Sequence, residues 1–292
     1  MSSPAAFKSV ALIGRYNTPA SAGTLVQLGE FLVARGCRVR MEQDTARSCG
    51  VSGYALASYD AIGADCDLAV VLGGDGSMLS AARHLAAYSV PLVGINHGRL
   101  GFMTDIAADT MLETLGKVLD GEYSVEERTM LAAKVIRGET TIFSTLALND
   151  VVVNKGAVGR LIEFLVRIDG EFVYDLRSDG LIVATPTGST AYALSSNGPI
   201  LQPSVPGFAL VPICPHTLSN RPITVSENSR IEVRLMRAID ARLHFDGQPQ
   251  CDLHEQDQVL VTRAEQKIRF VHPPGYSYFA MLRGKLHWSE MH

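Results

Sequence analysis

The stretch from Asp67 to Leu79 places one carboxylate in a glycine-rich turn directly after an apolar run. It reads Asp-Leu-Ala-Val-Val-Leu-Gly-Gly-Asp-Gly-Ser-Met-Leu, with Asp75 between glycines. An apolar run bounded by glycines predicts a strand buried on both faces. The glycines allow positive φ and a close approach of phosphate, and the N-terminus of the following helix favours an anion. A carboxylate beside an anion site makes sense as a metal ligand or as a base for a hydroxyl proton, which points to phosphoryl transfer.

We interpret the turn as a phosphate loop formed by Gly73, Gly74, Gly76 and Ser77, with the Ser77 hydroxyl capping the next helix. The alternative is a turn selected for packing alone, since strand–Gly-Gly–helix connections occur in many α/β proteins. The chain has no Gly-x-x-x-x-Gly-Lys-Ser/Thr sequence, and the turn does not fit Gly-x-Gly-x-x-Gly. A conventional P-loop enzyme and a Rossmann dehydrogenase are therefore disfavoured.

A second cluster runs from Arg177 to Gly198. A predicted strand, Leu181–Ala184, leads into a turn with six Ser/Thr residues between positions 185 and 196, and a short helix is expected over Thr190–Ser196. The hydroxyls could bind ribose, amide or base edges, and Tyr192 offers an aromatic face. The alternative is that these side chains only cap and turn the backbone.

Asn149 and Asp150 interrupt a run that otherwise predicts a buried strand. Adjacent polar side chains in an apolar strand are costly unless they have partners. Neighbouring strand residues point to opposite faces, so both reach one ligand only at a bend or a strand end. A bulge or an edge position is the alternative.

The elements predict an α/β domain followed by an all-β domain. Up to about Leu119, short strands alternate with helices, which predicts a Rossmann-like parallel sheet. From about Thr129, alternating and β-branched runs predict an antiparallel β-sandwich, with a hairpin turn at Asp169-Gly170. We expect domains at 1–128 and 129–271, with the tail 272–292 packed on the first. The expected elements are Val10–Ile13, Leu25–Ala34, Arg38–Glu42, Leu68–Leu72, Met78–Ala87, Leu92–Ile95, Thr110–Leu119, Met130–Ile136, Thr141–Leu148, Val151–Val153, Leu161–Ile168, Glu171–Leu176, Ile231–Leu235, Ala241–Phe245, Gln258–Thr262 and Lys267–Val271.

Composition narrows the class of protein. The 292 residues are 47% hydrophobic and carry a net charge of −4, without a basic block that would suggest nucleic acid or a membrane surface. The five cysteines are scattered, which argues against a disulfide framework or a zinc site. No apolar stretch is long enough to cross a bilayer, and the N-terminus lacks the apolar region of a signal peptide. We therefore expect a cytoplasmic protein.

Taken together and in this order, these pieces resemble the bacterial NAD kinases. The segment from Thr185 to Tyr192 (Thr-Pro-Thr-Gly-Ser-Thr-Ala-Tyr) is the specific part, because lipid kinases and phosphofructokinases share a similar glycine loop. The resemblance spans nearly the whole chain. The other matching pieces are Gly73-Gly74-Asp75-Gly76, Gly94-Ile95-Asn96, Gly101-Phe102, Asn149-Asp150, Asp179-Gly180 and the run Pro215–Pro222.

The resemblance implies transfer of the ATP γ-phosphate to the 2′-hydroxyl of the adenosine ribose of NAD, giving NADP. It implies that Asp75 accepts the hydroxyl proton, that Gly76 lies against the dinucleotide, and that Asn149 and Asp150 contact ribose. Here the family usually has Asn-Glu, and Asp is one methylene shorter. The remaining positions that match NAD contacts are Arg160, Arg177, Asp179, Thr187, Thr190, Ala191, Tyr192, Ala193, Leu194, Ser195 and Gln248.

We expect NAD and ATP as substrates, with Mg²⁺ arriving on ATP, because no cluster has the spacing of a dedicated transition-metal site. The resemblance implies a homodimer or homotetramer. Two other functions stay open: a dinucleotide sensor without catalysis, and a lipid or sugar kinase with the same glycine loop. The sequence leaves open whether NADH is also phosphorylated and whether polyphosphate replaces ATP.

Overall fold

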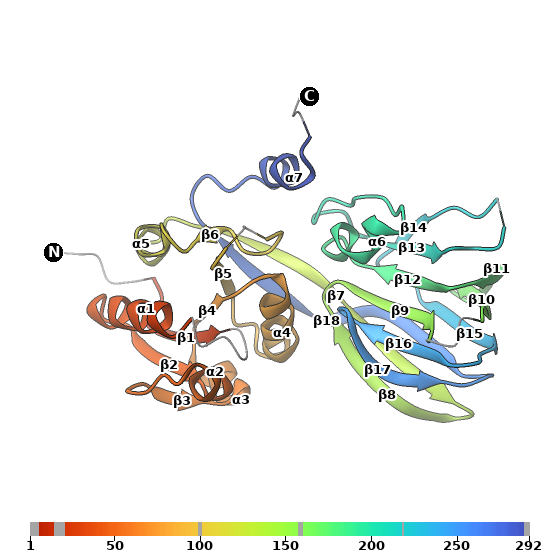
Figure 1. Ribbon diagram of the computed structural model, residues 1–292, viewed down its shortest axis with the longest axis horizontal. Coiled ribbons are helices and arrows are strands. Elements are labelled where there is room, and N and C mark those ends of the chain that lie inside the picture. Colours follow the sequence, from red (N-terminus) through yellow and green to blue (C-terminus); the bar gives the residue numbers. More distant parts are fainter. Residues whose placement is uncertain (1–5, 15–20, 99–100, 157–159, 218, 289–292) are drawn as a thin grey trace. The chain divides into compact units, whose positions relative to one another are not determined.

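The computed structural model describes residues 6–14, 21–98, 101–156, 160–217 and 219–288. Leu218 of the Pro215–Pro222 run and both chain ends, which include the first residues of the N-terminus and the last of the tail, lie outside these ranges. The chain forms two compact units, Met1–Glu127 with Ile268–His292, and Arg128–Lys267. Two strands, β7 (Ser124–Arg137) and β18 (Gln258–His272), run from one unit into the other (Figure 1). The single strand β18 joins two ranges that the sequence predicted as separate strands.

The first unit is built on a parallel sheet. Its strands lie in the order β6-β5-β4-β1-β2-β3, and each neighbouring pair is parallel. The order turns back between β1 and β4, and ligands of such sheets bind at the carboxyl ends of the strands beside that point. Asp75 follows β4 and therefore lies at this edge. The strands are β1 (Ser9–Gly14), β2 (Arg38–Glu42), β3 (Ala55–Ala57), β4 (Leu68–Leu72), β5 (Leu92–Asn96) and β6 (Ile106–Ala107).

Helices cover this sheet because their apolar residues pack against alternate strand residues. Helices α1 (Ala22–Ala34), α2 (Gln43–Cys49) and α5 (Met111–Leu119) share one hydrophobic cluster with β1, β4 and β5. Helices α3 (Tyr59–Asp65) and α4 (Asp75–Leu85) contact each other through the stacked rings of Tyr59 and His84, 4.2 Å apart. The described residues of this unit also include the 3₁₀ turn η2 (Ala86–Tyr88) and α7 (Tyr278–Leu286).

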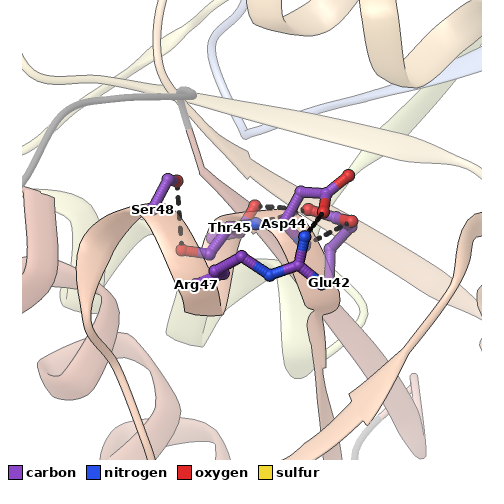
Figure 2. Close-up of polar contacts among 5 residues, drawn as sticks. All are labelled: Glu42, Asp44, Thr45, Arg47 and Ser48. Carbon is purple, nitrogen blue, oxygen red and sulfur yellow. Dashed lines mark hydrogen bonds and ion pairs between the residues drawn. The ribbon is translucent and has the colours of Figure 1, made fainter.

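The N-terminus of α2 is fixed by a side chain at the end of β2. The buried carboxylate of Glu42 accepts hydrogen bonds from the backbone N–H groups of Asp44 (2.9 Å) and Thr45 (2.7 Å) (Figure 2). It also accepts from the Thr45 hydroxyl at 2.8 Å. The Thr45 hydroxyl in turn accepts from the N–H of Gly14, the last residue of β1. Glu42 thus satisfies two of the N–H groups that a helix start leaves without intrahelical acceptors.

A buried histidine near the end of β18 joins three segments of the first unit. His272 is 3% exposed, its Nδ1 lies 2.5 Å from an Asp105 oxygen, and its Nε2 lies 3.0 Å from a Glu126 oxygen. Its ring stacks on Tyr276 at 3.7 Å. Burial lowers the pKa of His272, but the hydrogen bonds to the two carboxylates outweigh this, so the pKa is raised above 6.5. We call these four residues the His272 clamp.

The second unit is an antiparallel β-sandwich. One sheet contains β11, β10, β15, the first part of β18, β7 and β8, and the other has the order β14-β13-β12-β9-β16-β17. Inward residues of both sheets form one core around Phe164, Phe208 and Phe245. The strands not yet given are β8 (Thr140–Ala147), β9 (Asp150–Lys155), β10 (Ile162–Ile168), β11 (Glu171–Ser178), β12 (Gly180–Ala184), β13 (Gly207–Ile213), β14 (Ile223–Ser226), β15 (Ile231–Arg237), β16 (Ala241–Phe245) and β17 (Gln248–Leu253).

The predicted fold class, a parallel α/β unit followed by an antiparallel β unit, is confirmed. The hairpin turn at Asp169-Gly170 is also confirmed, with φ of 54° and 84° at its two residues. The same positive-φ pair recurs at Asp246-Gly247, between β16 and β17. Within the described ranges, no helix has the length and apolar character needed to cross a membrane.

Candidate active site

Asp75 is the first residue of α4. The N-cap residue is Gly74, at φ −103° and ψ −170°. The predicted cap at Ser77 is wrong, because Ser77 lies inside the first turn, where its N–H donates to the Gly74 carbonyl at 2.9 Å. The sequence also led us to expect positive φ at the loop glycines, but none of Gly73, Gly74 and Gly76 adopts it. A Cβ built on Gly74 or Gly76 meets no atom within 4 Å, so these glycines leave the helix N-terminus open.

The carboxylate of Asp75 is held by a neighbouring backbone segment. Its Oδ2 accepts from the N–H of Phe102 at 2.9 Å, and its Oδ1 accepts from the N–H of Met103 at 3.0 Å. Each carboxylate oxygen can accept a second hydrogen bond. The N-terminal end of α4 also favours a negative charge at this position. Asp75 is therefore fixed in orientation and keeps acceptor capacity for a further donor.

Asn149 and Asp150 lie at the start of a strand, which is a placement that allows both side chains to reach one ligand. Strand β9 begins at Asp150, and Asn149 directly precedes it. Both residues are less than 10% exposed, and both line a cavity of about 410 Å³ in the second unit. The other lining residues are Val152, Asn154, Ala191, Tyr192, His244, Asp246 and Gly247.

Two carboxyl groups meet in this cavity. Asp246 accepts hydrogen bonds from the backbone N–H groups of Asn149 (2.7 Å) and Leu148 (3.3 Å), and more distantly from that of Asp150 (3.4 Å). Burial, and then the negative charge of Asp246, raise the pKa of Asp150 from 3.8 to about 7. Near neutral pH, the Asp150 carboxyl thus exists in both forms and can donate or accept a hydrogen bond.

The cavity also contains acceptors without a donor. The side-chain oxygens of Asn149 and Asn154 are buried and have no hydrogen-bond partner within the described part of the chain. Burial, and then the charge of Arg242, lower the pKa of His244, so its imidazole is mainly neutral at pH 7. Unpaired buried amide oxygens are costly. Their presence favours a ligand that brings N–H or O–H donors.

The hydroxyl-rich segment after β12 is mostly occupied with its own turn. The Thr185 hydroxyl donates to the Leu148 carbonyl at 2.5 Å and accepts from the Gly188 N–H at 3.1 Å. Ser189 is fully buried, and its hydroxyl accepts from the Leu201 N–H at 2.9 Å. For these hydroxyls, the capping interpretation is the one that the contacts support.

This turn is nevertheless packed directly on the cavity. The Thr185 N–H donates to the Asn149 carbonyl at 2.9 Å, and a Cβ on Gly188 would lie only 2.0 Å from the same oxygen. Only glycine fits there. The turn then continues into the 3₁₀ turn η3 (Gly188–Thr190) and α6 (Tyr192–Ser195), which brings Ala191 and the half-exposed ring of Tyr192 to the cavity.

Several residues expected to contact the dinucleotide do not line this cavity. Thr187 accepts from the Arg128 guanidinium at 3.2 Å, and Thr190 donates to the Thr187 carbonyl at 3.1 Å. Ala193 is the buried residue of α6, Leu194 is half-buried, and Ser195 lines a separate cavity of about 500 Å³.

The charged and amide residues of the expected set are spread over the second unit. Arg177 is exposed on β11, with Glu163 at 3.7 Å, and Asp179 pairs with Lys155 at 2.7 Å. Arg160 is exposed in the β9–β10 connection. Gln248, the first residue of β17, is exposed and pairs with Phe245.

Five cavity residues were not singled out from the sequence as site residues: Val152, Asn154, His244, Asp246 and Gly247. The period of two along β9 could have indicated Asn154, since it lies four residues after Asp150 on the same face. Asp246 and Gly247 form an Asp-Gly pair, which as a sequence pattern indicates a turn and not a binding site. Within the ranges that the structure covers, no three or more His, Cys, Asp or Glu side chains lie close enough to hold a metal ion.

Comparison with known proteins agrees with both halves of this arrangement. Residues 10–123 match the family model of the ATP-NAD kinase N-terminal domain, and residues 148–273 match that of the ATP-NAD kinase C-terminal domain. The chain is 59% identical over 284 residues to the NAD kinase of Aromatoleum aromaticum, covering 97% of this chain and 95% of that protein. It is 55% identical over 286 residues to the NAD kinase of an Azoarcus species, covering 98% and 97%.

Solved structures of related kinases also match this chain over nearly its whole length. Yeast NADH kinase complexed with NADH has a TM-score of 0.88 and 27% identity, covering 98% of this chain and 89% of that chain. An NAD kinase from Archaeoglobus fulgidus in complex with ATP has a TM-score of 0.76 and 27% identity, covering 96% and 98%. Because both family models match and full-length relatives share more than half of their residues with it, the chain belongs to the NAD kinase family.

Proposed function

We propose that the protein transfers the γ-phosphate of ATP to the 2′-hydroxyl of the adenosine ribose of NAD, with Asp75 as the acceptor of the hydroxyl proton. The observation that carries the proposal is the fixed carboxylate of Asp75, held by two backbone N–H groups at the carboxyl end of β4. A protein that only binds a dinucleotide gains little from a carboxylate placed beside phosphates.

The chemistry needs a base at this point. A ribose hydroxyl is a poor nucleophile at neutral pH, and a positioned carboxylate that takes its proton contributes typically 10²–10⁴-fold. The O–H bond breaks as the hydroxyl oxygen forms its bond to the γ-phosphorus, and ADP leaves. The open N-terminus of α4 offers backbone N–H groups to an anionic phosphate.

The cavity of the second unit supports recognition of one end of the dinucleotide. Its volume of about 410 Å³ is in the range of small-molecule sites. The Tyr192 ring can stack on a base, and the unpaired Asn149 oxygen can accept from an amide or an exocyclic amine. The protonated form of Asp150 can donate to a ring nitrogen or hydroxyl oxygen, and its ionised form can accept from a hydroxyl.

ATP as donor is supported by the family and by the ATP complex of the Archaeoglobus relative. We propose that Mg²⁺ arrives bound to the ATP phosphates and neutralises part of their charge. The described residues present no cluster that could hold it independently. NADH is a second candidate acceptor, because the yeast relative was solved with NADH.

The test is product identification. The purified protein is incubated with NAD, ATP and Mg²⁺, and the product is examined by mass spectrometry and by ³¹P NMR, which distinguishes a 2′-phosphate from a 3′-phosphate. The proposal predicts NADP and ADP in equal amounts. Binding of NAD without NADP formation would instead indicate a sensor, and phosphorylation of a sugar or lipid in a parallel panel would indicate another kinase. Replacing ATP by polyphosphate, and NAD by NADH, defines the donor and the acceptor.

We further propose that the protein acts in the cytoplasm as a homodimer or homotetramer, as its family implies. Light scattering on the purified protein measures the mass directly. A monomeric mass near 31.5 kDa at the concentration of the assay would contradict the oligomer.

A further inference from the structure

The segment that holds Asp75 depends on a small polar network behind it. The two N–H donors belong to Phe102 and Met103, which follow Gly101. The Gly101 N–H donates to the Thr104 hydroxyl oxygen at 2.8 Å, which closes a tight turn over residues 101–104. The position of the Asp75 carboxylate is therefore linked to one buried hydroxyl.

Thr104 is itself fixed from the end of β5. It is fully buried, and its hydroxyl oxygen also accepts from the side-chain N–H of Asn96 at 3.0 Å. The side-chain oxygen of Asn96, Oδ1, accepts from the Gly98 N–H at 2.8 Å. Asn96 is the last residue of β5, so the network is anchored on the strand that neighbours β4. Both lone pairs of the Thr104 oxygen are used as acceptors.

Two positions at this turn have no space for a side chain and are occupied by glycine. A Cβ on Gly101 would lie 2.0 Å from the Asp75 Oδ1 and 2.7 Å from the Thr104 hydroxyl oxygen. A Cβ on Gly94, in β5, would lie 2.6 Å from the Met103 carbonyl oxygen. The carboxylate, the turn and the strand are thus in direct contact, with no room for another side chain.

We propose that Thr104 is the positioning residue for Asp75 and that Asn96 holds Thr104 in place. Their hydrogen bonds shape the turn so that the N–H groups of residues 102 and 103 each donate to one oxygen of the Asp75 carboxylate. The role in turnover rests on the proposed function of Asp75 as proton acceptor. The alternative is that the Thr104 hydroxyl only stabilises a buried loop. A structural role alone predicts lost stability, whereas a positioning role predicts lost kcat with nearly unchanged KM.

The experiment compares Thr104→Val, which removes the hydroxyl at nearly constant volume, with Thr104→Ser, which keeps it. Thr141→Val, at an exposed position on β8, is the matched control. The first measurement uses no substrate: hydrogen exchange of the Phe102 and Met103 amides. Thr104→Val should speed exchange at both amides at least tenfold, and Thr104→Ser should stay close to wild type. Unchanged exchange in Thr104→Val would overturn the proposal.

The second measurement is steady-state turnover. A displaced catalytic group can cost up to about 10²-fold, so we expect kcat of Thr104→Val to fall roughly 10- to 100-fold, with KM for NAD and ATP within about twofold of wild type. Thr104→Ser should restore kcat to within about threefold. A raised KM at unchanged kcat, or equal losses in Thr104→Val and Thr104→Ser, would contradict positioning.

Gly101→Ala provides an independent variant in case Thr104→Val does not fold, as judged by circular dichroism. Its added Cβ pushes on the Asp75 carboxylate without removing any hydroxyl, and the same loss of kcat is expected. If wild type makes no NADP, the proposed function fails, yet the exchange measurement still decides whether Thr104 holds the turn.

Discussion

Replacing Asp150 by Asn should make the second unit more stable at alkaline pH and change its response to pH. Asp150 is 4% exposed, and burial together with the charge of Asp246 raises its pKa from 3.8 to about 7. Each pKa unit corresponds to about 1.4 kcal/mol. Ionising Asp150 is therefore about 4 kcal/mol costlier in the folded protein than in the unfolded chain.

The direction follows from proton binding. Between pH 3.8 and about 7, the folded state binds the Asp150 proton more tightly than the unfolded chain does, so this group's contribution to stability is full below pH 3.8 and falls as pH rises through that window. Asn cannot ionise and lacks this loss. The free energy of unfolding of Asp150→Asn, relative to wild type, should rise by about 2–3 kcal/mol between pH 5 and pH 8.

Urea unfolding at both pH values, followed by circular dichroism, measures this difference. Asp175→Asn is the matched control, because Asp175 is exposed on β11 of the same unit. Its stability relative to wild type should change by less than about 0.5 kcal/mol between the two pH values. NMR titration of the Asp150 carboxyl carbon gives the pKa directly. A midpoint near 4, or parallel pH dependences for Asp150→Asn and wild type, would refute the reasoning.

Three further outcomes follow from single contacts. The pKa of His272 is raised in the folded protein, so the His272 clamp contributes fully to the free energy of unfolding below pH 6.5. This contribution is lost as pH rises through the folded-state pKa of His272. His272→Gln should therefore cost roughly 3 kcal/mol at pH 6 and less at pH 9, and fluorescence of the single tryptophan, which lies in the same unit, reports the unfolding; an equal loss at both pH values would contradict the charged clamp. Gly188→Ala places a Cβ 2.0 Å from the Asn149 carbonyl and should destabilise by about 1–3 kcal/mol, whereas Gly284→Ala, where a Cβ meets nothing, should be neutral or stabilising in thermal melts. Tyr192→Leu should weaken NAD binding roughly tenfold in calorimetry through lost stacking, with Tyr192→Phe near wild type; equal affinities of Tyr192→Leu and wild type would remove the stacking role.

The centre of the parallel sheet was predictable because β1, β4 and β5 contain short apolar runs bounded by glycines or polar residues. Arg38–Glu42 and Leu68–Leu72 have the same bounds in the structure as in the prediction. Helix α2 was not predicted, because its residues, Gln43–Cys49, are mostly polar and lack an apolar period. Its start depends on the N-cap residue Glu42, whose carboxylate accepts from the first turn of the helix, and glutamate is not among the residues that a sequence reader expects at an N-cap (Figure 2). Strand β13 was also missed, since Pro212 interrupts its apolar run and proline argues against a central strand.

The candidate site was only partly readable for a similar reason. Asp75, Asn149 and Asp150 were predictable because each breaks an otherwise apolar or glycine-rich pattern. The role of Thr104 depends on a turn that brings Gly101 against Asp75, and sequence spacing does not reveal this. Asp246 reaches Asn149 only through the register of β16 on β9, across almost one hundred residues of chain.

The central claim is that Asp75 takes the proton from the ribose hydroxyl. Its most direct test is Asp75→Asn, which keeps the shape of the side chain and removes its basicity, assayed for NADP formation beside calorimetric binding of NAD. Asp175→Asn serves as the control. We predict that Asp75→Asn lowers kcat by at least 10²-fold, while its affinity for NAD stays within about threefold of wild type. Turnover of Asp75→Asn within about threefold of wild type, in protein that binds NAD normally, would contradict the account.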